Sequence, residues 1–542
     1  MDFPLEPSRN MARQVCRTCK IRKRRCNKAL PKCSLCARKN LRCEYTRPEP
    51  AVLPSPSVST APAAAASASA VWWEHDSDTD TPVIQPVTLS TLLFLDPYLL
   101  QHGPLDLSVP STLIPSQILD LLGNLVTIRS TAEKYFQHIH TWMPIISKTR
   151  FYDLYLTSSF RSKPDIVLLF LVQRLITSTP PSNPRTALYE TTKHFYVEVE
   201  GSSNPSLQIL QAGLLIALYE LGQGIYPAAY LSIGACARYA CLLGIEGNLG
   251  ASGATQRQRI GSPMVLSMLE MEERRRVWWG IVILDRFVNI SSPGRALATQ
   301  NPSLNDYLPA DDEDWENGII TPDNLHTLST PTQTHMSKFA LLCQAARILG
   351  QVLQHHATNI VNENTEDESE NTRIQLDRTL QSMLSASLAL ANPDYDQITF
   401  VYSALVALYT PSLATVHAGT GTSSPQSAHA KSLIGQVTRR VSTNLVERGC
   451  LLGRDVEEMA PWGLYFAYRV CEFHLRFLRA RKGGSAGEDD GDADGTGGEI
   501  EEVVRCLKDA FRMIQERWRV AGIYLGLLEA GEVLGYQVRK SV

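Results

Sequence analysis

Residues 16–43 read CRTCKIRKRRCNKALPKCSLCARKNLRC and hold six of the twelve cysteines in a chain of 542 residues. The spacing Cys-x2-Cys-x6-Cys begins at Cys16 and again at Cys33. The six thiols belong to Cys16, Cys19, Cys26, Cys33, Cys36 and Cys43. A Cys-x2-Cys pair brings two sulfurs to one ion across a tight turn, the usual start of a structural zinc site. The repeated spacing therefore predicts a zinc cluster made of two similar halves.

The number of cysteines predicts two zinc ions. Four thiolates complete a tetrahedral site, so six thiolates fill two sites only if two sulfurs bridge both ions. About 28 residues leave no room for an apolar core, so metal binding must supply the folding free energy. The alternative is a single four-thiolate site that leaves Cys26 and Cys43 unused, although these two fall at matching offsets in the two halves. A disulfide framework is not expected, because the N-terminus has no signal-peptide pattern.

The residues between the cysteines are strongly basic. Residues 1–50 carry 14 Lys and Arg against 4 Asp and Glu, although the whole chain has a net charge of −3. A cationic patch on an acidic chain is typical of a polyanion-binding site, with an affinity that falls with salt. The candidate DNA-binding residues are Arg17, Lys20, Arg22, Lys23, Arg24 and Arg25. A short helix carrying Lys23 can reach base edges in the major groove, while the other cations meet mainly phosphates.

From Cys16 to Tyr45 the chain resembles the fungal zinc binuclear cluster transcription factors. Every ligand spacing fits, and so do the basic first loop and Pro31, two residues before the fourth cysteine. The resemblance implies two zinc ions on six cysteines, with Cys16 and Cys33 bridging both ions. It also implies that Lys23, with Arg22 beside it, reads a CGG triplet in double-stranded DNA.

The same resemblance implies a function and a set of partners. Members of the family are nuclear, sequence-specific regulators of transcription by RNA polymerase II that act with the transcription machinery or coactivators. Relatives with this layout often control metabolic or secondary-metabolite genes. Family-level likeness does not identify target genes, and it leaves activation against repression open.

The composition predicts a mainly α protein in four parts. We expect a disordered N-terminus over residues 1–15, the cluster domain over 16–46, a flexible linker over 47–127 and an all-α regulatory domain over 128–542. The linker is rich in Pro, Ala and Ser and contains an acidic segment beside Trp72 and Trp73, which is either an activation region or a strip that packs on the main domain. Prolines interrupt every leucine run after the cluster, so no dimerising coiled coil is visible and a homodimer stays open.

Helical periodicity is clearest in two stretches of the regulatory domain. Apolar residues recur at helical spacing at Leu207, Leu210, Leu214, Leu218 and Leu221, and again at Val277, Ile281, Leu284 and Val288. We expect Glu272 and Arg276 to pair on an exposed helix face, and Arg274 to Arg276 to be solvated. Trp278 and Trp279 are interpreted as aromatic residues that pack between helices.

A second block resembles the middle homology region of the same family. The residues that carry the likeness are Glu272–Trp279, Leu284–Arg286, Gly294-Arg295 and the acidic stretch Asp311–Trp315. Relatives usually continue Gly-Arg with proline, whereas this chain has Ala296. The likeness covers about residues 130–320 and implies a regulatory domain, which in some relatives responds to a small-molecule effector. The sequence identifies no effector.

Two other function classes are weighed against a regulator. An all-helical enzyme with an acidic magnesium cluster, as in terpene cyclases, is suggested by Asp311–Asp314, but Trp315 stands where the third carboxylate belongs. No nucleophile elbow, phosphate-binding glycine loop or His-Glu-x-x-His helix is present in the sequence, so we predict no catalytic residues and no enzyme. A zinc-stabilised scaffold that binds protein or RNA is the other alternative, although the basic run lacks the aromatic residues that stack single-stranded bases.

The remaining signals are weak. Residues 482–498 are rich in Gly and Asp, and we interpret them as a disordered loop in preference to an EF-hand built on Asp490 and Glu501. The other six cysteines, Cys236, Cys241, Cys343, Cys450, Cys471 and Cys506, are expected to be buried reduced thiols. His138, His140, His355 and His356 are expected to be ordinary core or surface histidines. No apolar segment is long enough to suggest a membrane span.

Overall fold

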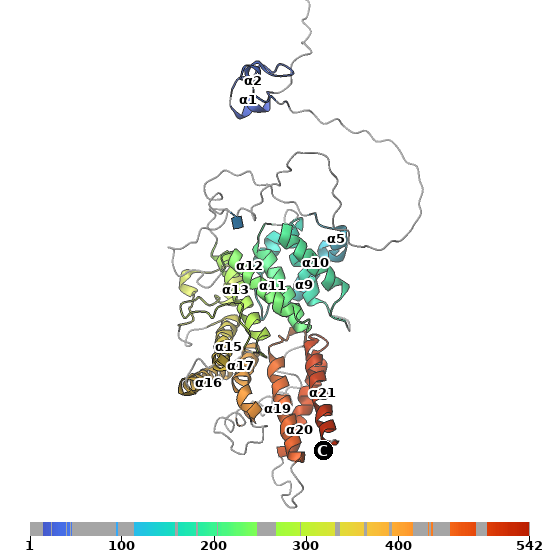
Figure 1. The fold of residues 1–542 in the computed structure, drawn as a ribbon, viewed down its shortest axis with the longest axis vertical. Coiled ribbons are helices and arrows are strands. Elements are labelled where there is room, and N and C mark those ends of the chain that lie inside the picture. Colours follow the sequence, from blue (N-terminus) through green and yellow to red (C-terminus); the bar gives the residue numbers. More distant parts are fainter. Residues whose placement is uncertain are drawn as a thin grey trace, which may run out of the picture. The chain divides into compact units, whose positions relative to one another are not determined.

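The computed structural model divides the chain into two compact units, residues 1–83 and residues 84–542 (Figure 1). In the first unit the structure describes residues 15–22, 24–39, 41–43 and 45. In the second unit it describes residues 94–95, 113–157, 161–179, 183–202, 204–245, 267–292, 294–330, 336–361, 366–389, 393–415, 432, 435–436, 456–483 and 496–540.

The first unit contains two helices of five residues, α1 (Arg17–Ile21) and α2 (Ser34–Arg38). Each helix follows a cysteine in an extended conformation, Cys16 at φ −66°, ψ 150° and Cys33 at φ −65°, ψ 151°. Among the described residues of this unit the buried side chains are cysteines, since Cys16, Cys19, Cys33 and Cys36 form its small core. The repeat in the sequence is therefore also a repeat in the backbone, and sulfur takes the place of an apolar core.

The second unit is built from helices. They are α5 (Ser116–Leu122), α6 (Leu125–His138), α7 (Lys148–Arg150), the π-helix η1 (Phe151–Tyr155), α9 (Pro164–Thr177), α10 (Ala187–Ser202), α11 (Leu207–Gly222), α12 (Ala228–Leu242), α13 (Met268–Val288), α14 (Asp312–Glu316), η2 (Pro322–Asn324), α15 (Lys338–Val361), α16 (Glu366–Leu388), α17 (Tyr395–Thr415), η4 (Val456–Glu458), α19 (Gly463–Gly483), α20 (Thr496–Ile514) and α21 (Val520–Lys540). Within the described ranges there is no strand, although isolated bridges occur, such as the antiparallel bridge between Tyr307 and Thr327. The predicted mainly α fold class is confirmed.

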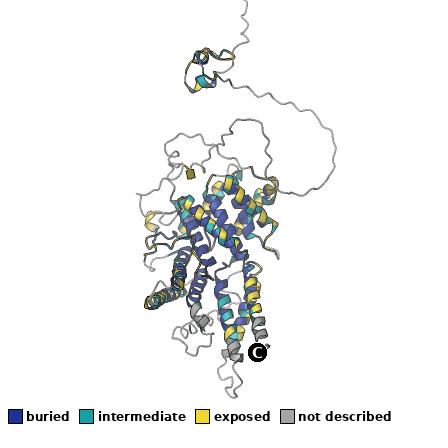
Figure 2. Cartoon of the chain, in the orientation of Figure 1, coloured by how far each residue is buried: buried dark blue, intermediate teal, exposed yellow. Residues whose placement is uncertain are grey.

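Helices α11 and α13 lie in the interior of the helical unit. Helix α11 packs against α9, α10, α12 and α13, and every residue of it except Gln208 is buried (Figure 2). Helix α15 packs against α13, α16 and α17, and α19 continues the packing from α17 to α20 and α21. One continuous apolar core therefore runs through the unit from α5 to α21.

Helix α13 packs its apolar stripe into the core, as its sequence predicts. A capping box opens it, in which Ser267 and Glu270 exchange side-chain and backbone hydrogen bonds. The apolar stripe from Val277 to Val288 is buried, and Trp279 is only 1% exposed. The predictions of a core-facing stripe and of helix-packing tryptophans are confirmed.

The expectation of a solvated basic face on α13 is wrong. Glu272 and Arg276 do pair, with Nε and Oε1 2.9 Å apart, but both side chains are fully buried, and Arg275 is buried beside them. Arg276 also donates to Asp312 Oδ1 at 2.7 Å and lies 4.0 Å over the ring of Trp315. The partners come from a segment more than 30 residues later, and helical periodicity cannot reveal such partners.

Two predicted boundaries also differ from the structure. Helix α5 and the start of α6 precede residue 128, and Ile118 and Leu122 are buried in the core, because Pro115 stands at the N-cap of α5 and does not interrupt it. Helix α19 reaches Gly483 and α20 begins at Thr496, so both ends of the expected loop 482–498 are helical. The Asp490 region of the calcium-loop alternative lies outside the described residues, and the second half of that pattern, through Glu501, is helical.

A search of the described residues finds no helix that is both long and apolar enough to cross a lipid bilayer.

Candidate metal centre and nucleic-acid interface

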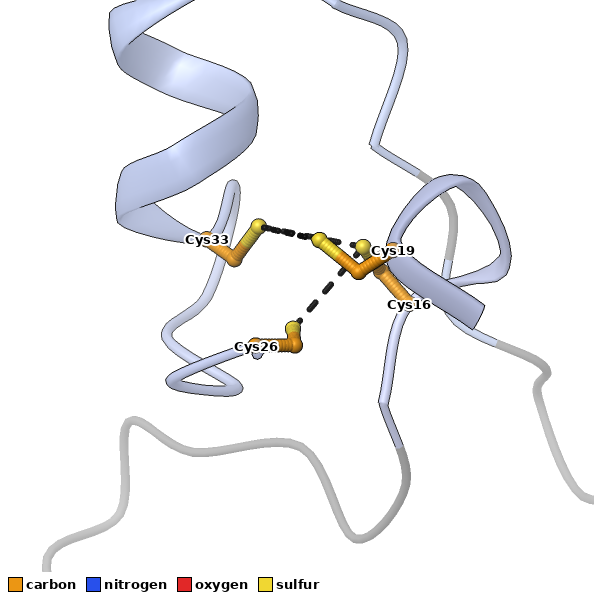
Figure 3. Close-up of side chains that lie close together, drawn as sticks. All are labelled: Cys16, Cys19, Cys26 and Cys33. Carbon is orange, nitrogen blue, oxygen red and sulfur yellow. Dashed lines mark hydrogen bonds between the residues drawn. The ribbon is translucent and has the colours of Figure 1, made fainter. Parts of the chain in front are cut away.

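The six predicted zinc ligands gather in one place. Their sulfurs form two overlapping sets in which all ligand atoms lie within 4.8 Å of one another: Cys16, Cys19, Cys26 and Cys33, and Cys16, Cys33, Cys36 and Cys43. Figure 3 shows the first set, with Cys16 and Cys19 from the α1 half facing Cys33 from the α2 half. Cys16 and Cys33 belong to both sets, as the bridging ligands of a two-ion cluster must.

The sulfur spacing matches tetrahedral zinc. Two thiolates about 2.3 Å from one ion at the tetrahedral angle lie roughly 3.8 Å apart. The Sγ–Sγ distance is 3.7 Å between Cys16 and Cys33 and 3.8 Å between Cys16 and Cys26. Cys19 and Cys36, which belong to different sets, are also 3.9 Å apart, so these distances alone also fit a single site. Cys26 and Cys43 distinguish a two-ion cluster from a single site. Each of them completes one of the two sets of four sulfurs, whereas a single four-thiolate site would leave both of these cysteines without a metal ion.

Backbone amides support the sulfurs. The N–H of Cys36 donates to Cys33 Sγ at 3.4 Å, and the N–H of Cys33 donates to Cys43 Sγ at 3.2 Å. The first bond follows from the turn that starts α2, which aims a free N–H group of the helix at the side chain of its N-cap residue, Cys33. Such bonds favour the thiolate form that zinc requires.

Without metal the thiols differ in acidity. Burial raises the pKa of Cys19 well above its usual range and that of Cys36 to about 12. Burial alone would also raise the pKa of Cys33, but hydrogen bonds from the backbone and thiol of Cys36 lower it to about 6. At neutral pH a metal ion must therefore displace the protons of Cys19 and Cys36, and its affinity should fall as the pH falls.

Three contacts that the sequence did not indicate fasten the two halves together. Thr18 donates its hydroxyl to the carbonyl of Arg42, and Tyr45 donates its phenol to the carbonyl of Ala29 at 2.8 Å. The side chain of Asn27 accepts the N–H of Ser34 at 3.0 Å. Thr18 and Tyr45 fall within the motif, but their types carry no chemical signal for a structural role, and only the folded unit reveals it.

The predicted DNA-binding residues are only partly described. Lys20 lies in the last turn of α1, and Arg22, Arg24 and Arg25 follow it, all with exposed side chains. Arg17 is the first residue of α1, but its side chain lies outside the described set, and Lys23 is not described at all. Helix α1 ends at Ile21, and the described residues Arg22, Arg24 and Arg25 follow it, while the expectation that a short helix carries Lys23 lies outside the described residues.

The second half of the unit adds cations that the prediction did not include. Lys32, Arg38, Lys39 and Arg42 are all exposed on or near α2. The exposed surface of the unit is thus basic on both halves, while its interior is sulfur. This pairing of a metal-held core with a cationic exterior suits contact with a polyanion.

The acidic stretch of the enzyme alternative has structural roles. Asp311 caps α14 by accepting the N–H of Glu313 at 2.9 Å, and Asp312 pairs with Arg276. In the part of the chain that the structure describes, cysteines alone form groups of three or more potential metal ligands. Asp311 and Asp312 therefore have structural roles at the start of α14.

The other histidines and cysteines lie mostly in the core, as expected. His140 stacks on Trp315 at 5.8 Å between ring centroids, and His356 bonds to the carbonyl of Ala407 at 3.1 Å. Cys236, Cys343 and Cys471 are buried, Cys506 is half-buried, and Cys450 lies outside the described residues. The expectation of burial is wrong for Cys241, which is exposed near the end of α12.

Two family models match the chain. The fungal Zn(2)-Cys(6) binuclear cluster domain matches residues 14–51, and the fungal specific transcription factor domain matches residues 132–390. The second match extends beyond the middle region expected from the sequence, about 130–320, and includes α15 and α16. No solved structure matches the chain.

Several fungal regulators are similar to the chain. Transcription factor BOA15 of Botryotinia fuckeliana is 36% identical over 169 residues, which are 31% of this chain and 89% of that protein. The pigment biosynthesis transcriptional activator pigB of Monascus ruber is 26% identical over 38% of this chain and 39% of its own length. The depudecin biosynthesis cluster-specific transcription activator DEP6 of Fusarium langsethiae is 26% identical over 51% of this chain and 56% of its own. The chain thus spans less than two thirds of the last two relatives.

The cluster geometry, the basic surface and both family matches lead to one assignment. The chain belongs to the fungal transcription factors with a Zn(2)-Cys(6) binuclear cluster, a domain that binds two zinc ions.

Proposed function

We propose that the six cysteines hold the two zinc ions with Cys16 and Cys33 as the bridging ligands, and that the unit they fold reads double-stranded DNA. The observation that carries the proposal is the pair of overlapping sulfur sets that share these two cysteines. A bridged cluster joins the two halves, since Cys16 and Cys33 would each be a ligand of both ions and loss of either cysteine would weaken both sites.

The basic residues have different roles in the proposal. Lys23 contacts base edges, and the phosphate contacts come from Arg17, Lys20, Arg22, Arg24 and Arg25. The exposure of Lys20, Arg22, Arg24 and Arg25 supports this role, because each can reach a phosphate without unfolding the unit. CGG-type triplets are the proposed target, following the family resemblance carried by the cysteine spacing and by Lys23.

The proposed biological role is nuclear regulation of RNA polymerase II transcription at secondary-metabolite genes. The printed names of pigB and DEP6 support it, because both describe activators of a biosynthetic pathway. DNA, the transcription machinery and, for a paired site, a second copy of the chain are the proposed partners. The proposal assigns no catalytic step to the helical unit and names no effector for it.

The test is binding-site selection with the zinc-loaded full-length chain and random duplex DNA at near-physiological salt. Enrichment of two CGG triplets at a fixed spacing supports the proposal and indicates a dimer, whereas a single CGG indicates a monomer on one half-site. No enrichment, or binding that competitor RNA abolishes, overturns sequence-specific readout and favours the zinc-scaffold alternative. Salt dependence measured alongside separates phosphate contacts from base contacts.

A further inference from the structure

The C-terminal ends of α9 and α11 form one surface of the family-matched region. Helix α11 ends at Gly222, and it is followed by Gln223, a fully buried C-cap residue, and by Gly224 at φ +68°. Helix α9 ends nearby at Thr177. Helix C-termini expose carbonyl groups without intrahelical partners and carry partial negative charge. This surface is called here the α11 end, and a buried cation against it is favoured by the partial negative charge of the helix ends.

The covering segment is the turn between α20 and α21, residues 515–519, called here the docking turn. Its Trp518 is fully buried against Gly222, where a Cβ atom would lie only 2.1 Å from Cε3 of the indole. A Cβ at Gly224 would lie 2.3 Å from Cδ1 of Ile523 in α21. Both glycines thus leave room for residues nearly 300 positions later in the chain.

Hydrogen bonds join the same two segments. Gln223 donates its side-chain N–H to the carbonyl of Arg517 at 3.0 Å and accepts the N–H of Arg519 at 3.4 Å. Arg517 donates Nη2 to the carbonyl of Ile176 at 2.7 Å, in the last turn of α9. Its guanidinium lies 4.2 Å from the ring centroid of Trp518, and burial lowers its pKa to about 10. The docking turn therefore places a buried guanidinium on a carbonyl of the last turn of α9 and exchanges two hydrogen bonds with the side chain of Gln223, the C-cap residue of α11.

Aromatic packing extends the contact. The ring of Trp142, after α6, lies 5.7 Å from that of Trp462 and 6.4 Å from that of Trp518. Trp518 also donates Nε1 to the carbonyl of Met459 at 2.7 Å, just before α19. Segments before α9, before α19 and after α20 thus meet at one buried junction.

We propose that the α11 end is an intramolecular docking site whose partner is the docking turn, and that this contact makes helices α19–α21 one cooperative unit with the family-matched region. The family match ends at residue 390, so the partner lies wholly outside it. The C-terminal helices then complete the regulatory domain and are not an appended segment. The inference goes beyond the proposed DNA-binding function and does not rest on it.

The test is hydrogen exchange of the full-length chain, read separately over α11, α15–α16 and α19–α21. Gly222→Ala should increase exchange in α11 and in α19–α21 together, even though alanine is the better helix former. The matched control is Gly234→Ala in α12, where a Cβ has no neighbour within 4 Å and exchange should not increase. Trp518→Ala should speed exchange in both segments by roughly a hundredfold or more, as expected for loss of a buried tryptophan.

The double variant Gly222→Ala/Trp518→Ala makes the test specific. Removal of the indole removes the clash, so Gly222→Ala should then add little to the effect of Trp518→Ala. Additive effects, or exchange in α19–α21 that rises while α11 stays protected, would overturn the proposal. Zinc content and DNA binding serve as a separate readout, and a failure of either would bear on the proposed function and not on this contact.

Discussion

The two units of this protein reach a fixed structure by opposite means. The cluster unit has two five-residue helices and a core of cysteine side chains, whereas the helical unit has an apolar core that runs from α5 to α21. The first depends on a metal that the chain does not itself supply, and the second depends on an apolar core with hydrogen bonds and ion pairs between its own residues. The cluster unit should therefore respond to metal and acid, and the helical unit to changes of side-chain volume.

Metal removal should produce the largest difference in stability between the two units. Structural zinc sites contribute about 10–16 kcal/mol to folding at neutral pH, so a strong chelator should unfold residues 16–45 and abolish DNA binding. Hydrogen exchange of α9, α11 and α13 should stay the same, because no described residue of these helices takes part in the sulfur sets. Unfolding of the helical unit by the chelator would contradict this separation.

A core substitution should produce the reverse result. Trp279 is buried in α13 and donates Nε1 to the carbonyl of Tyr307 at 3.0 Å. Trp279→Ala should lower the free energy of unfolding of the helical unit by about 3–5 kcal/mol in denaturant titration, with zinc content unchanged. The matched control is Val126→Ala, since Val126 is 74% exposed and its truncation should cost no more than about 0.5 kcal/mol. If Trp279→Ala and Val126→Ala lowered the free energy of unfolding equally, the core around Trp279 would not be tightly packed.

Within the cluster unit, base contacts can be separated from phosphate contacts. Lys23→Ala should cost about 1–3 kcal/mol on the selected duplex and relax base choice, with a smaller loss on random duplex. Lys32→Ala, at an exposed lysine of the same unit, is the control and should change both affinities by the same factor. Fluorescence anisotropy at two salt concentrations measures both affinities. If Lys23→Ala lost the same affinity on the selected and on the random duplex, Lys23 would contact only phosphate.

Mild acid should weaken the helical unit by a smaller amount. Burial lowers the pKa of His356 and of His474 to about 4, below the unfolded value of about 6.5. Between these values the unfolded chain binds more protons, so stability is fully present above pH ~6.5 and falls as the pH approaches ~4. At pH 5.5 each of these two histidines should lower the free energy of unfolding of the helical unit by about 1 kcal/mol relative to neutral pH. Thermal unfolding of wild type and His356→Gln between pH 5 and 7.5 measures this slope, which should be shallower in the variant.

Local spacing made the cluster predictable and left much of the helical unit hidden. The six cysteines lie within residues 16–43, so their spacing in the sequence is enough to predict that their sulfurs meet. The apolar stripe of α13 was equally predictable, because hydrophobic periodicity indicates which face of a helix is buried. Periodicity does not show which distant residues contact a helix, so the burial of Arg276 against Trp315 was not predicted.

Long-range contacts set the other limit. Gln223 and Arg517 bond across 294 positions, and neither residue type signals a distant partner. Nothing in the sequence around Gly222 indicates that its missing side chain makes room for Trp518. The early start of the helical domain was missed for a local reason, since Pro115 is equally compatible with a helix start and with a helix break.

The most direct test of the account is the number of zinc ions per full-length chain, measured by native mass spectrometry. The overlapping sulfur sets predict two ions in the wild type and loss of the two-ion form in Cys26→Ala, while Cys506→Ala, outside the cluster, keeps both. A single ion in the wild type, or two ions retained in Cys26→Ala, would contradict the bridged cluster and the reading of DNA that depends on it.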